Sequence, residues 1–299
     1  MKPIRCATVL ALLAVLLVSR AEAAPVEIKD DLGRTIKLEA PAKRAVALYG
    51  AFAEMFYAIG AGPELIARTQ ADVYPPKIEK LPSVGTHMRP NMEMIMALKP
   101  DLVVQSASRN EDLSGMEALR GAGIPVAVFS PDSFEGLFST MVRLGVLTGH
   151  EAGAGSAVEG LRKRLDEVKG RLDTVQARHK VFFEVRAEPL TGAGTGSIVQ
   201  KILEAAGAEN VLKVDKSLVQ FNVEALLASE PDVYIVQRGP MNKNPLDPKN
   251  RPHFERLRAV QEGRIIFVDE FLYSRPGPRC VDAVEELAGA LYPETKKSR

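Results

Sequence analysis

The apolar positions between residues 158 and 175 follow a single helical stripe. Spacings of three and four residues separate Val158, Leu161, Leu165, Val168, Leu172 and Val175. Such spacings place side chains on one face of a helix. We therefore predict one long helix over residues 150–179, suited to be a rigid strut between two lobes. An ordinary surface helix and half of a coiled coil are the alternatives, although a coiled coil usually sustains its pattern over more heptads.

Short apolar runs alternate with helical patterns on both sides of this stretch. Before it, the pattern predicts a hairpin at 26–38, strands at 45–48, 65–67, 101–104 and 125–129, and helices at 51–59, 92–98, 116–122 and 132–147. After it come strands at 181–185, 233–236 and 264–268, a glycine-rich loop at 191–197, and helices at 198–206, 223–228, 254–260 and 281–292. Alternating strands and helices favour parallel sheets. The expected fold class is α/β, with two lobes that carry parallel-type sheets and are bridged by a single long α-helix.

One helix–turn–strand unit occurs in each half of the chain. Residues 91–104 begin with Asn91, place Glu93 two positions later, continue as an apolar helix and reach a strand through Pro-Asp. Residues 222–236 repeat this order from Asn222 and Glu224, with one extra residue. Each lobe is therefore expected to carry a glutamate in the first turn of a matched helix, where the helix dipole favours a carboxylate.

The first 23 residues have the features of a signal peptide. Lys2 and Arg5 precede an apolar core of about ten residues, too short for a membrane span, and residues 21–23 are a small-residue cleavage site. Cys6 precedes the apolar core, where a lipid-anchoring cysteine does not lie. We expect a signal peptide at 1–23, an N-terminal lobe at 24–149, the bridging helix at 150–179 and a C-terminal lobe at 180–299, with secretion to the periplasm and no lipid anchor.

Charge and cysteine content exclude further classes of function. Removal of residues 1–23 takes three of the 39 basic residues and one of the 38 acidic residues, which leaves 36 and 37 and a net charge of −1. This balance argues against a nucleic-acid-binding protein. The mature chain keeps one cysteine, Cys280, so no intramolecular disulfide is expected. Its place on an apolar helix face favours a core residue over a nucleophile.

Several motifs carry a family resemblance. They are the run 46–48 that leads to Glu54, the stretch 58–62, residues 90–93 with 97–103, Glu224 with Pro231-Asp232, and residues 274–279. Through them, nearly all of residues 26–295 resembles the periplasmic solute-binding proteins of ABC importers for iron–siderophore, haem and vitamin B12. The resemblance implies two lobes joined by one rigid helix, in a monomer that delivers a metal chelate to an importer permease with its ATPase. It also implies that Glu93 and Glu224 bind permease arginines, so that the chain contacts the membrane only through the importer.

The candidate ligand-binding residues follow the carboxyl ends of the predicted strands, where parallel α/β lobes bind ligands. Arginine and tyrosine are frequent among them and suit a large, anionic, partly aromatic ligand, because guanidinium groups bind carboxylate, catecholate or phosphate oxygens and stack on rings. An exposed loop arginine is often only solvated, and Arg275 with Arg279 could instead fix the turn 276–278. The candidates are Tyr49, Arg68, Tyr74, His87, Arg89, Gln105, Ser106 and Arg109 in the first lobe, and Arg186, Thr195, Gln220, Phe221, Gln237, Arg238, Tyr273 and Arg275 in the second.

The histidines do not predict a resident metal site. The four histidines include no pair at helical spacing, and His87 is the one that lies in a predicted cleft loop. Hydroxamate-siderophore members of the family carry an arginine at about this place, so the chain departs from that branch. Haem would need His87, Met88 or a tyrosine as axial ligand, and the tryptophan that often lines vitamin B12 receptors is absent. We expect no cofactor and favour a ferric siderophore as ligand, with a corrinoid or haem as the alternative.

Enzyme motifs are incomplete in this sequence. Residues 191–197 resemble a phosphate loop but lack its Gly-Lys-Ser/Thr ending, although the helix that follows could hold an anionic group at its N-terminus. No Gly-x-Ser-x-Gly motif stands at a strand-to-helix turn. No turnover is therefore expected. A metal-ion receptor or a chelate-modifying enzyme is the alternative from another functional class.

Overall fold

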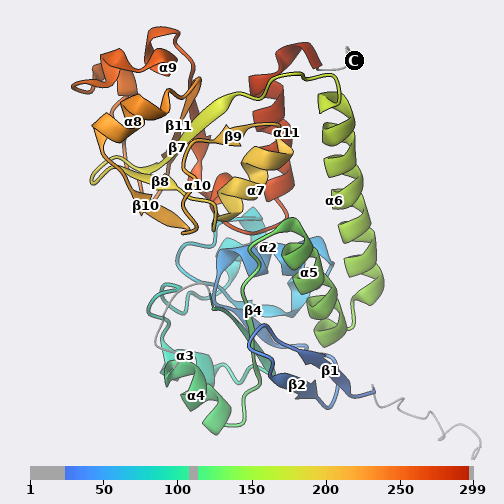
Figure 1. Ribbon diagram of the computed structural model, residues 1–299. Helices are drawn as coiled ribbons and strands as arrows, with labels where there is room; N and C mark the ends of the chain where they lie inside the picture. Colours follow the sequence, from blue (N-terminus) through green and yellow to red (C-terminus); the bar gives the residue numbers. More distant parts are fainter. Residues whose placement is uncertain (1–23, 108–113, 296–299) are drawn as a thin grey trace, which may run out of the picture.

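The structure, a computed structural model, describes residues 24–107 and 114–295. They form two lobes with one long helix along the side of both (Figure 1). The predicted signal peptide and the candidate residue Arg109 lie outside the described residues. Within the described ranges, no helix is long and apolar enough to cross a membrane.

The first lobe is built on a parallel sheet of four strands in the order β4–β3–β5–β6. These strands are Leu65–Ala67, Ala45–Ala47, Leu102–Ser106 and Val126–Phe129, and a separate antiparallel hairpin pairs β1 (Val26–Lys29) with β2 (Thr35–Leu38). The predicted hairpin, strands and helices of this half are confirmed, with ends shifted by at most two residues. The helices are α2 (Gly50–Ala58), α3 (Met92–Ala97), α4 (Ser114–Gly121) and α5 (Phe134–Thr148), with 3-10 turns η1 (Gly62–Glu64) and η2 (Pro76–Lys80).

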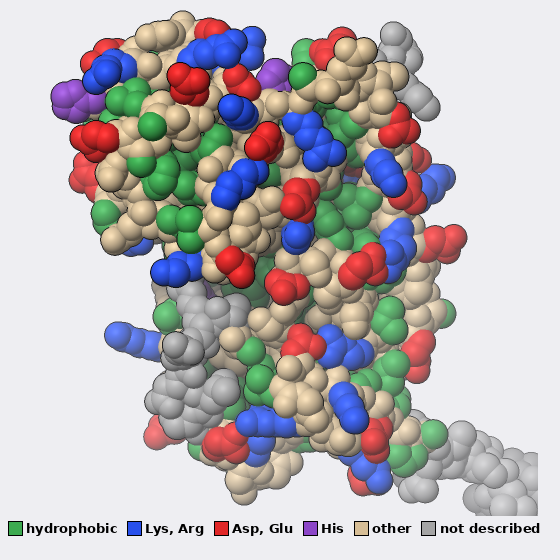
Figure 2. All heavy atoms as spheres, viewed as in Figure 1, with side chains coloured by type: hydrophobic (Ala, Val, Ile, Leu, Met, Phe, Trp, Pro, Cys, Tyr) green, Lys and Arg blue, Asp and Glu red, His purple; other side chains and the backbone are tan. Residues whose placement is uncertain are grey.

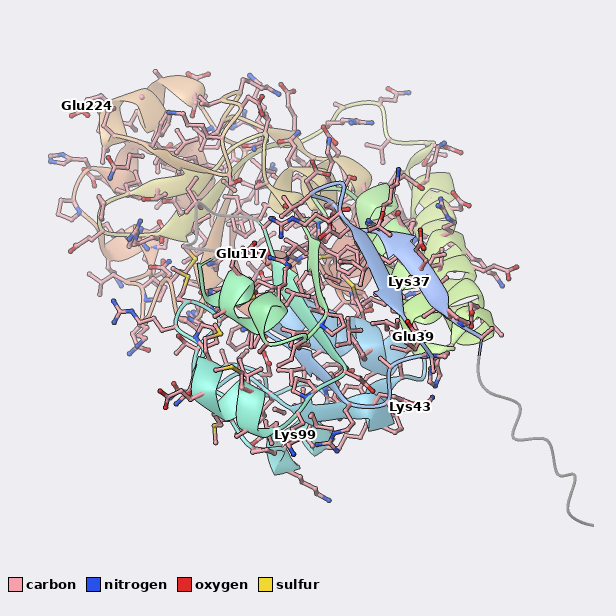
Figure 3. All side chains as sticks on the ribbon, turned by 90° about the horizontal axis from the view of Figure 1, so that it is seen from below. Lys37, Glu39, Lys43, Lys99, Glu117 and Glu224 are labelled. Atoms are coloured by element: carbon pink, nitrogen blue, oxygen red, sulfur yellow. The ribbon has the colours of Figure 1, made fainter. Side chains whose placement is uncertain are left out.

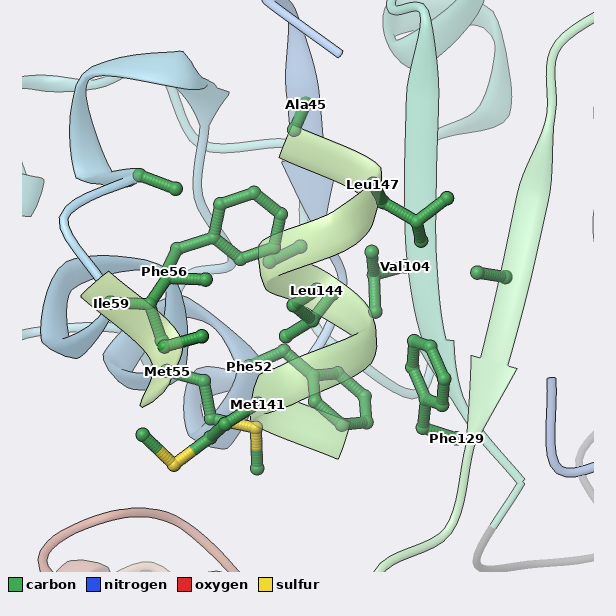
Figure 4. Close-up of a cluster of buried hydrophobic side chains, with 14 of the residues drawn as sticks. Ala45, Phe52, Met55, Phe56, Ile59, Val104, Phe129, Met141, Leu144 and Leu147 are labelled. Carbon is green, nitrogen blue, oxygen red and sulfur yellow. The ribbon is translucent and has the colours of Figure 1, made fainter. Parts of the chain in front are cut away.

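The core of the first lobe lies between its sheet and helices α2 and α5 (Figure 4). Phe52, Met55 and Phe56 on α2 and Ile59 directly after it recur at helical spacing, and all are fully buried. The ring of Phe52 meets that of Phe129 edge to face, with centroids 6.0 Å apart. This packing fixes the orientation of α2, whose remaining residues are then available to contact the second lobe.

The second lobe has a mixed sheet in the order β10–β8–β7–β11–β12, with β9 also paired to β7. In that order, with β9 last, the strands are Leu218–Gln220, Thr191–Ala193, Lys180–Arg186, Val233–Arg238, Ile265–Asp269 and Glu209–Asn210. Strands β7, β11 and β12 are parallel, whereas β8 is antiparallel to both β7 and β10. The prediction of a parallel sheet therefore holds for the centre of this lobe and not for its β8–β10 edge. The helices are α7 (Ile198–Ala205), α8 (Val223–Ser229), α9 (Arg258–Gln261), α10 (Glu270–Tyr273) and α11 (Cys280–Leu291), with 3-10 turns η3 (Pro248–Asn250), η4 (Phe254–Arg256) and η5 (Pro293–Thr295).

Three local predictions are corrected by the structure. The glycine-rich loop contains strand β8, where Gly192 and Gly194 let two backbones approach closely; a Cβ on Gly194 would lie 2.3 Å from the carbonyl oxygen of Lys216. The predicted helix 254–260 is divided into η4 and α9. Helix α5 starts at Phe134 and not at the predicted residue 132, because Ser133 caps it with a hydroxyl that accepts a hydrogen bond from the Gly136 N–H (3.2 Å).

Helix α6 (Glu151–Leu172) bridges the two lobes. It has 22 residues and ends seven residues before the predicted end, so it is about 33 Å long at 1.5 Å per residue. Its apolar stripe packs on both lobes in turn. Val158 and Leu161 belong to the core of the first lobe, Val168 belongs to the core of the second, and Leu165 contacts both.

Candidate functional site

The loops that follow the strands of both lobes border a hollow between the lobes. Figure 2 shows this hollow on the side away from α6, with lysine and arginine side chains at its rim. Tyr49 follows β3 and Arg68 follows β4, while β7 and β11 end at Arg186 and Arg238. Ligands of α/β sheets bind at such strand ends. We therefore take this hollow as the candidate ligand-binding cleft.

Two aromatic rings of the first lobe lie together at the strand ends. The rings of Tyr49 and His87 have centroids 5.7 Å apart and an interplanar angle of 55°, and both side chains are half-buried. Tyr49 also meets Phe52 of the core edge to face at 5.9 Å, which anchors it to α2. His87 lies in a tight loop closed by a backbone bridge between Gly85 and Pro90. The pair is therefore a fixed aromatic surface.

The first-lobe arginines differ in how far their guanidinium groups are tied to the protein. Arg68 Nη1 donates to the carbonyl oxygens of Thr69, Gln70 and Asp72 at 3.1, 3.4 and 3.4 Å. These bonds tie the Arg68 guanidinium to its own loop. Arg89, by contrast, is exposed.

Four candidate residues are buried in the structure, and Ser106, at 8% exposed, is one of them. The Gln105 side chain is 5% exposed, and its Oε1 accepts a hydrogen bond from the Ser106 N–H at 2.9 Å. Gln237 is fully buried on β11, which lies between β7 and β12 in the sheet. Tyr273 is also fully buried, since α10 packs on α11, and its hydroxyl donates to Glu286 Oε1 at 3.2 Å. The structure thus places Gln237 and Tyr273 in the core, and we remove both from the candidate set.

Two second-lobe candidates, Arg186 and Arg238, border cavities. The guanidinium of Arg238 lies 3.7 Å from the ring centroid of Phe267, and Arg238 borders a cavity of about 460 Å³ together with Lys243. Arg186 borders a second cavity of about 510 Å³ that shares Lys243. Phe221 stacks on Phe182, with ring centroids 5.8 Å apart. Both cavities lie at the carboxyl edge of the central strands.

A buried ionic network fixes the loop that borders these cavities. The carboxylate of Glu184 is fully buried and accepts two hydrogen bonds from Arg251, one from the Tyr234 hydroxyl (2.5 Å) and one from the Asn242 amide (3.0 Å). Arg251 Nε also donates to the carbonyl oxygen of Leu246 at 2.8 Å. Burial, together with the Glu184 charge, raises the pKa of Tyr234 well above its usual value, so the phenol stays a donor. Sequence analysis missed this network because its members lie 50 to 67 positions from Glu184.

Two arginines cross from the second lobe to the first. Arg279 forms a bidentate ion pair with Glu54 of α2, with Nε–Oε2 and Nη2–Oε1 distances of 3.0 and 2.7 Å, and Glu54 is 5% exposed. Arg275 Nη2 donates to the carbonyl oxygen of Ala71 at 3.3 Å. The alternative that these arginines only fix their own turn is therefore corrected, because both contact the first lobe.

The carboxyl groups of Glu54 and Asp72, which lie where these arginines meet the first lobe, are largely shielded from water. Burial raises the pKa of Glu54, although the hydrogen bond and charge of Arg279 act in the opposite direction. Burial also raises the pKa of Asp72, against the hydrogen bond that its carboxylate accepts from the Thr69 N–H at 2.7 Å. Each carboxylate is thus held by donors at a site where charge is costly.

Two further kinds of reactive group in the described residues are metal-ligating side chains and the thiol of Cys280. Across residues 24–107 and 114–295, no group of three or more histidine, cysteine, aspartate or glutamate side chains could hold a metal ion. The thiol of Cys280 is buried and donates to the carbonyl oxygen of Arg275 at 2.8 Å. Burial raises its pKa to about 12. Such a thiol is a poor nucleophile.

The two glutamates of the repeated unit occupy matched positions. Glu93 and Glu224 are both exposed in the first turns of α3 and α8. The side chains of Asn91 and Asn222 cap these helices by accepting a backbone N–H three residues on, at 2.9 and 2.7 Å. The predicted helix starts are confirmed. In Figure 1, α3 and α8 lie on the side away from α6, one in each lobe.

Comparison with known proteins identifies the family. The family described as periplasmic binding protein matches residues 46–271. The chain belongs to this family. The two-lobe fold of this binding protein agrees with that membership, and the resemblance inferred from its motifs is confirmed.

Proteins similar to this binding protein are named for different ligands. It is 29% identical to an uncharacterised ABC transporter substrate-binding lipoprotein of Bacillus subtilis, over 93% of this chain and 89% of the relative. It is 26% identical to a vitamin B12-binding protein of Pectobacterium atrosepticum, over 83% and 88%. Among solved structures, a periplasmic haem-binding protein of Pseudomonas aeruginosa has a TM-score of 0.76 at 26% identity, over 85% and 94%.

Proposed function

We propose that this binding protein captures a cobalt corrinoid of the vitamin B12 class in its cleft and delivers it to the permease of an ABC importer. The observation that carries the ligand class is how the cleft arginines are used. Arg68 donates to its own loop, Arg275 to the first lobe, and Arg279 to Glu54. Glu54 pairs with the charge of Arg279, and backbone carbonyl oxygens occupy donors of Arg68 and Arg275, so these three arginines offer fewer free N–H groups to a strongly anionic chelate.

Aromatic rings supply much of the remaining candidate surface. Tyr49 and His87 form the ring pair of the first lobe, and Tyr74 is 45% exposed. In the second lobe, Phe267 and Phe271 lie under the guanidinium groups of Arg238 and Arg275. A corrinoid presents a broad ring with mainly uncharged amide arms, which suits such a surface better than a ferric siderophore does. This argument reverses the order of ligands that we expected from the sequence.

Similarity to known proteins supports the same class of ligand. The vitamin B12-binding protein of Pectobacterium atrosepticum matches most of this chain. Haem is the second candidate, because His87 offers an imidazole beside Tyr49 that could serve as an axial ligand. The similarity to the haem-binding protein of Pseudomonas aeruginosa supports this alternative.

Parallel calorimetric titrations test the ligand class. The mature protein is titrated with cyanocobalamin, haemin, a ferric catecholate and a ferric hydroxamate under one set of conditions. We expect saturable 1:1 binding of cyanocobalamin and weaker binding of both ferric siderophores. Binding of a ferric siderophore without cyanocobalamin would reject the proposal, and a Soret shift with haemin that is lost in His87→Ala would favour haem.

Two variants test the proposed cleft surface. Tyr49→Ala should weaken cyanocobalamin binding, whereas Tyr57→Ala is a matched control, because Tyr57 is a half-buried tyrosine of α2 that contacts Lys77. Arg238→Ala should weaken an anionic ferric catecholate by about 1.5–3 kcal/mol, the usual contribution of a charge-assisted hydrogen bond, and cyanocobalamin by less. Equal losses for both ligands would reject the charge argument.

A further inference from the structure

The second lobe inserts a wedge into the first. The wedge consists of residues 275–281, which include the start of α11. Val281 is fully buried within the core of the first lobe. Gly277 lies so close to α2 that a Cβ on it would be 3.6 Å from the Cβ of Ala51 and 3.3 Å from a Glu54 carboxylate oxygen. Backbone of one lobe thus lies directly on a helix of the other.

An ion pair closes this contact. The guanidinium of Arg279 binds both carboxylate oxygens of Glu54 and lies 4.2 Å from the ring centroid of Tyr74, also of the first lobe. Arg279 belongs to the second lobe, so a rotation that moves the lobes apart at this contact separates the pair. Separation would leave the buried Glu54 carboxylate without its partner, which is strongly unfavourable.

The lobes are therefore fixed in two ways. Helix α6 packs along both cores through Val158, Leu161 and Val168. The wedge joins α11 to α2 through contacts that α6 does not make. A single helix restricts hinge motion, but a second non-covalent contact can fix the lobe angle and can also be released.

We propose that the wedge and Glu54 form a latch that holds the two lobes at a fixed angle and must open before the cleft widens. The latch rests on the proposed function, because release of a large ligand to a permease requires a wider cleft. The latch itself is defined without any ligand. The rigidity of the molecule then depends on the Glu54–Arg279 pair as well as on α6.

Distances between two spin labels test the latch on the ligand-free protein. Lys99→Cys labels the first lobe, where Figure 3 shows Lys99 beside α3, and Lys216→Cys labels an exposed position of the second. Cys280 is fully buried and should stay unlabelled. We expect one narrow distance distribution for the labelled parent, and a broader distribution shifted to longer distances for both Glu54→Gln and Arg279→Gln.

A matched control variant and an engineered disulfide between the lobes test the same idea further. Arg162 also pairs bidentately with a glutamate, Glu135, but their side chains are 47% and 71% exposed, so Arg162→Gln should leave the distribution unchanged. Ala51→Cys with Gly277→Cys brings two Cβ atoms to 3.6 Å, within the range of a disulfide. Formed before labelling in the Arg279→Gln variant, this disulfide should restore the narrow distribution, and its reduction should remove the effect.

The outcomes separate the latch from folding and from the ligand class. Arg279→Lys keeps the charge but loses the bidentate geometry, so it should give an intermediate distribution even if Arg279→Gln does not fold. Parent-like distributions in Glu54→Gln and Arg279→Lys would overturn the latch. Failure of cyanocobalamin to bind, with altered distances in the variants, would reject the proposed ligand and leave the latch in place.

Discussion

At the residue scale, the stability of the second lobe depends on the partners of one buried charge. Glu184 is fully buried, and Arg251 supplies its positive partner. Arg251→Ala should lower the free energy of unfolding by about 3–5 kcal/mol, because it leaves an uncompensated charge in the core. Denaturant unfolding followed by circular dichroism measures this loss.

The exposed pair of Arg162 and Glu135 is the control for this prediction. Arg162→Ala should cost no more than about 1 kcal/mol, as is usual for exposed ion pairs. Losses of equal size in the two variants would mean that Glu184 finds another donor or that water reaches it.

Single residues also show how far the site could be predicted from the sequence. The places of Tyr49, His87 and Arg238 beyond the strands could be predicted because parallel strands end at one edge of a sheet, and their contact with a ligand stays a prediction. The Glu54–Arg279 pair was missed because its members lie 225 positions apart and only the docking of two lobes brings them together. Gln237 was misplaced because polarity at a strand end suggests exposure, whereas neighbouring strands and helices cover it.

At the element scale, α6 contains glycines in contrasting surroundings. Gly160 is exposed in the helix interior, and a Cβ there would meet nothing within 4 Å. Gly160→Ala should therefore stabilise the protein by about 0.5–1 kcal/mol through helix propensity. A Cβ on Gly153 would lie 2.2 Å from the carbonyl oxygen of Ile59, so Gly153→Ala should destabilise it by about 1–3 kcal/mol. Thermal unfolding of both variants checks the opposite signs, and two changes of the same sign would contradict the packing of α6 on α2.

The contact between α6 and α11 should make stability depend on pH. Arg164 donates to both oxygens of Glu285, at 2.9 and 2.6 Å, and this bonding lowers the pKa of Glu285 below its usual value of 4.5. The folded state then keeps this carboxylate ionised where the unfolded chain is already protonated. Its stabilising contribution is present above the unfolded pKa and is lost as the pH falls through the folded pKa.

Glu285→Gln should reveal this contribution. Near pH 7 the variant should be less stable than the parent by no more than about 1 kcal/mol, since both side chains are about one-third exposed. The difference should shrink as the pH falls below 4.5. Thermal midpoints across this range measure it, and a difference that grows toward low pH would show that the sign is wrong.

Most elements could be predicted because local patterns decide them. The alternation of apolar runs and capped helices placed α3, α8 and the parallel strands within a few residues. Strand β8 was missed because its pairing with β7 and β10 depends on distant residues and on two glycines. The same limit explains why α6 is shorter than its apolar stripe, which continues to Val175 beyond the end of the helix.

At the scale of the whole molecule, two separate lobes present the same chemical group. Glu93 and Glu224 are exposed in the first turns of α3 and α8, and Figure 3 shows Glu224 at the outer edge of the second lobe. Helix α6 and the proposed latch would hold the two carboxylates at a fixed separation. A permease with one arginine for each glutamate would then bind the protein in one orientation, because both ion pairs form only at that separation. Fixing the orientation of a partner is a usual contribution of charged pairs at an interface.

Removal of these carboxylates should affect delivery and little else. Exposed charges contribute little to folding, so Glu93→Ala, Glu224→Ala and the double variant should unfold and bind ligand like the parent. Uptake through the cognate importer in membrane vesicles should fall in each single variant and fall further in the double variant. Glu151→Ala is the matched control, because Glu151 is an exposed first-turn glutamate on the bridging helix. Uptake equal to that of the parent in the double variant would show that the two glutamates have no docking role and only begin their helices. A loss of ligand affinity would instead show that they line the cleft.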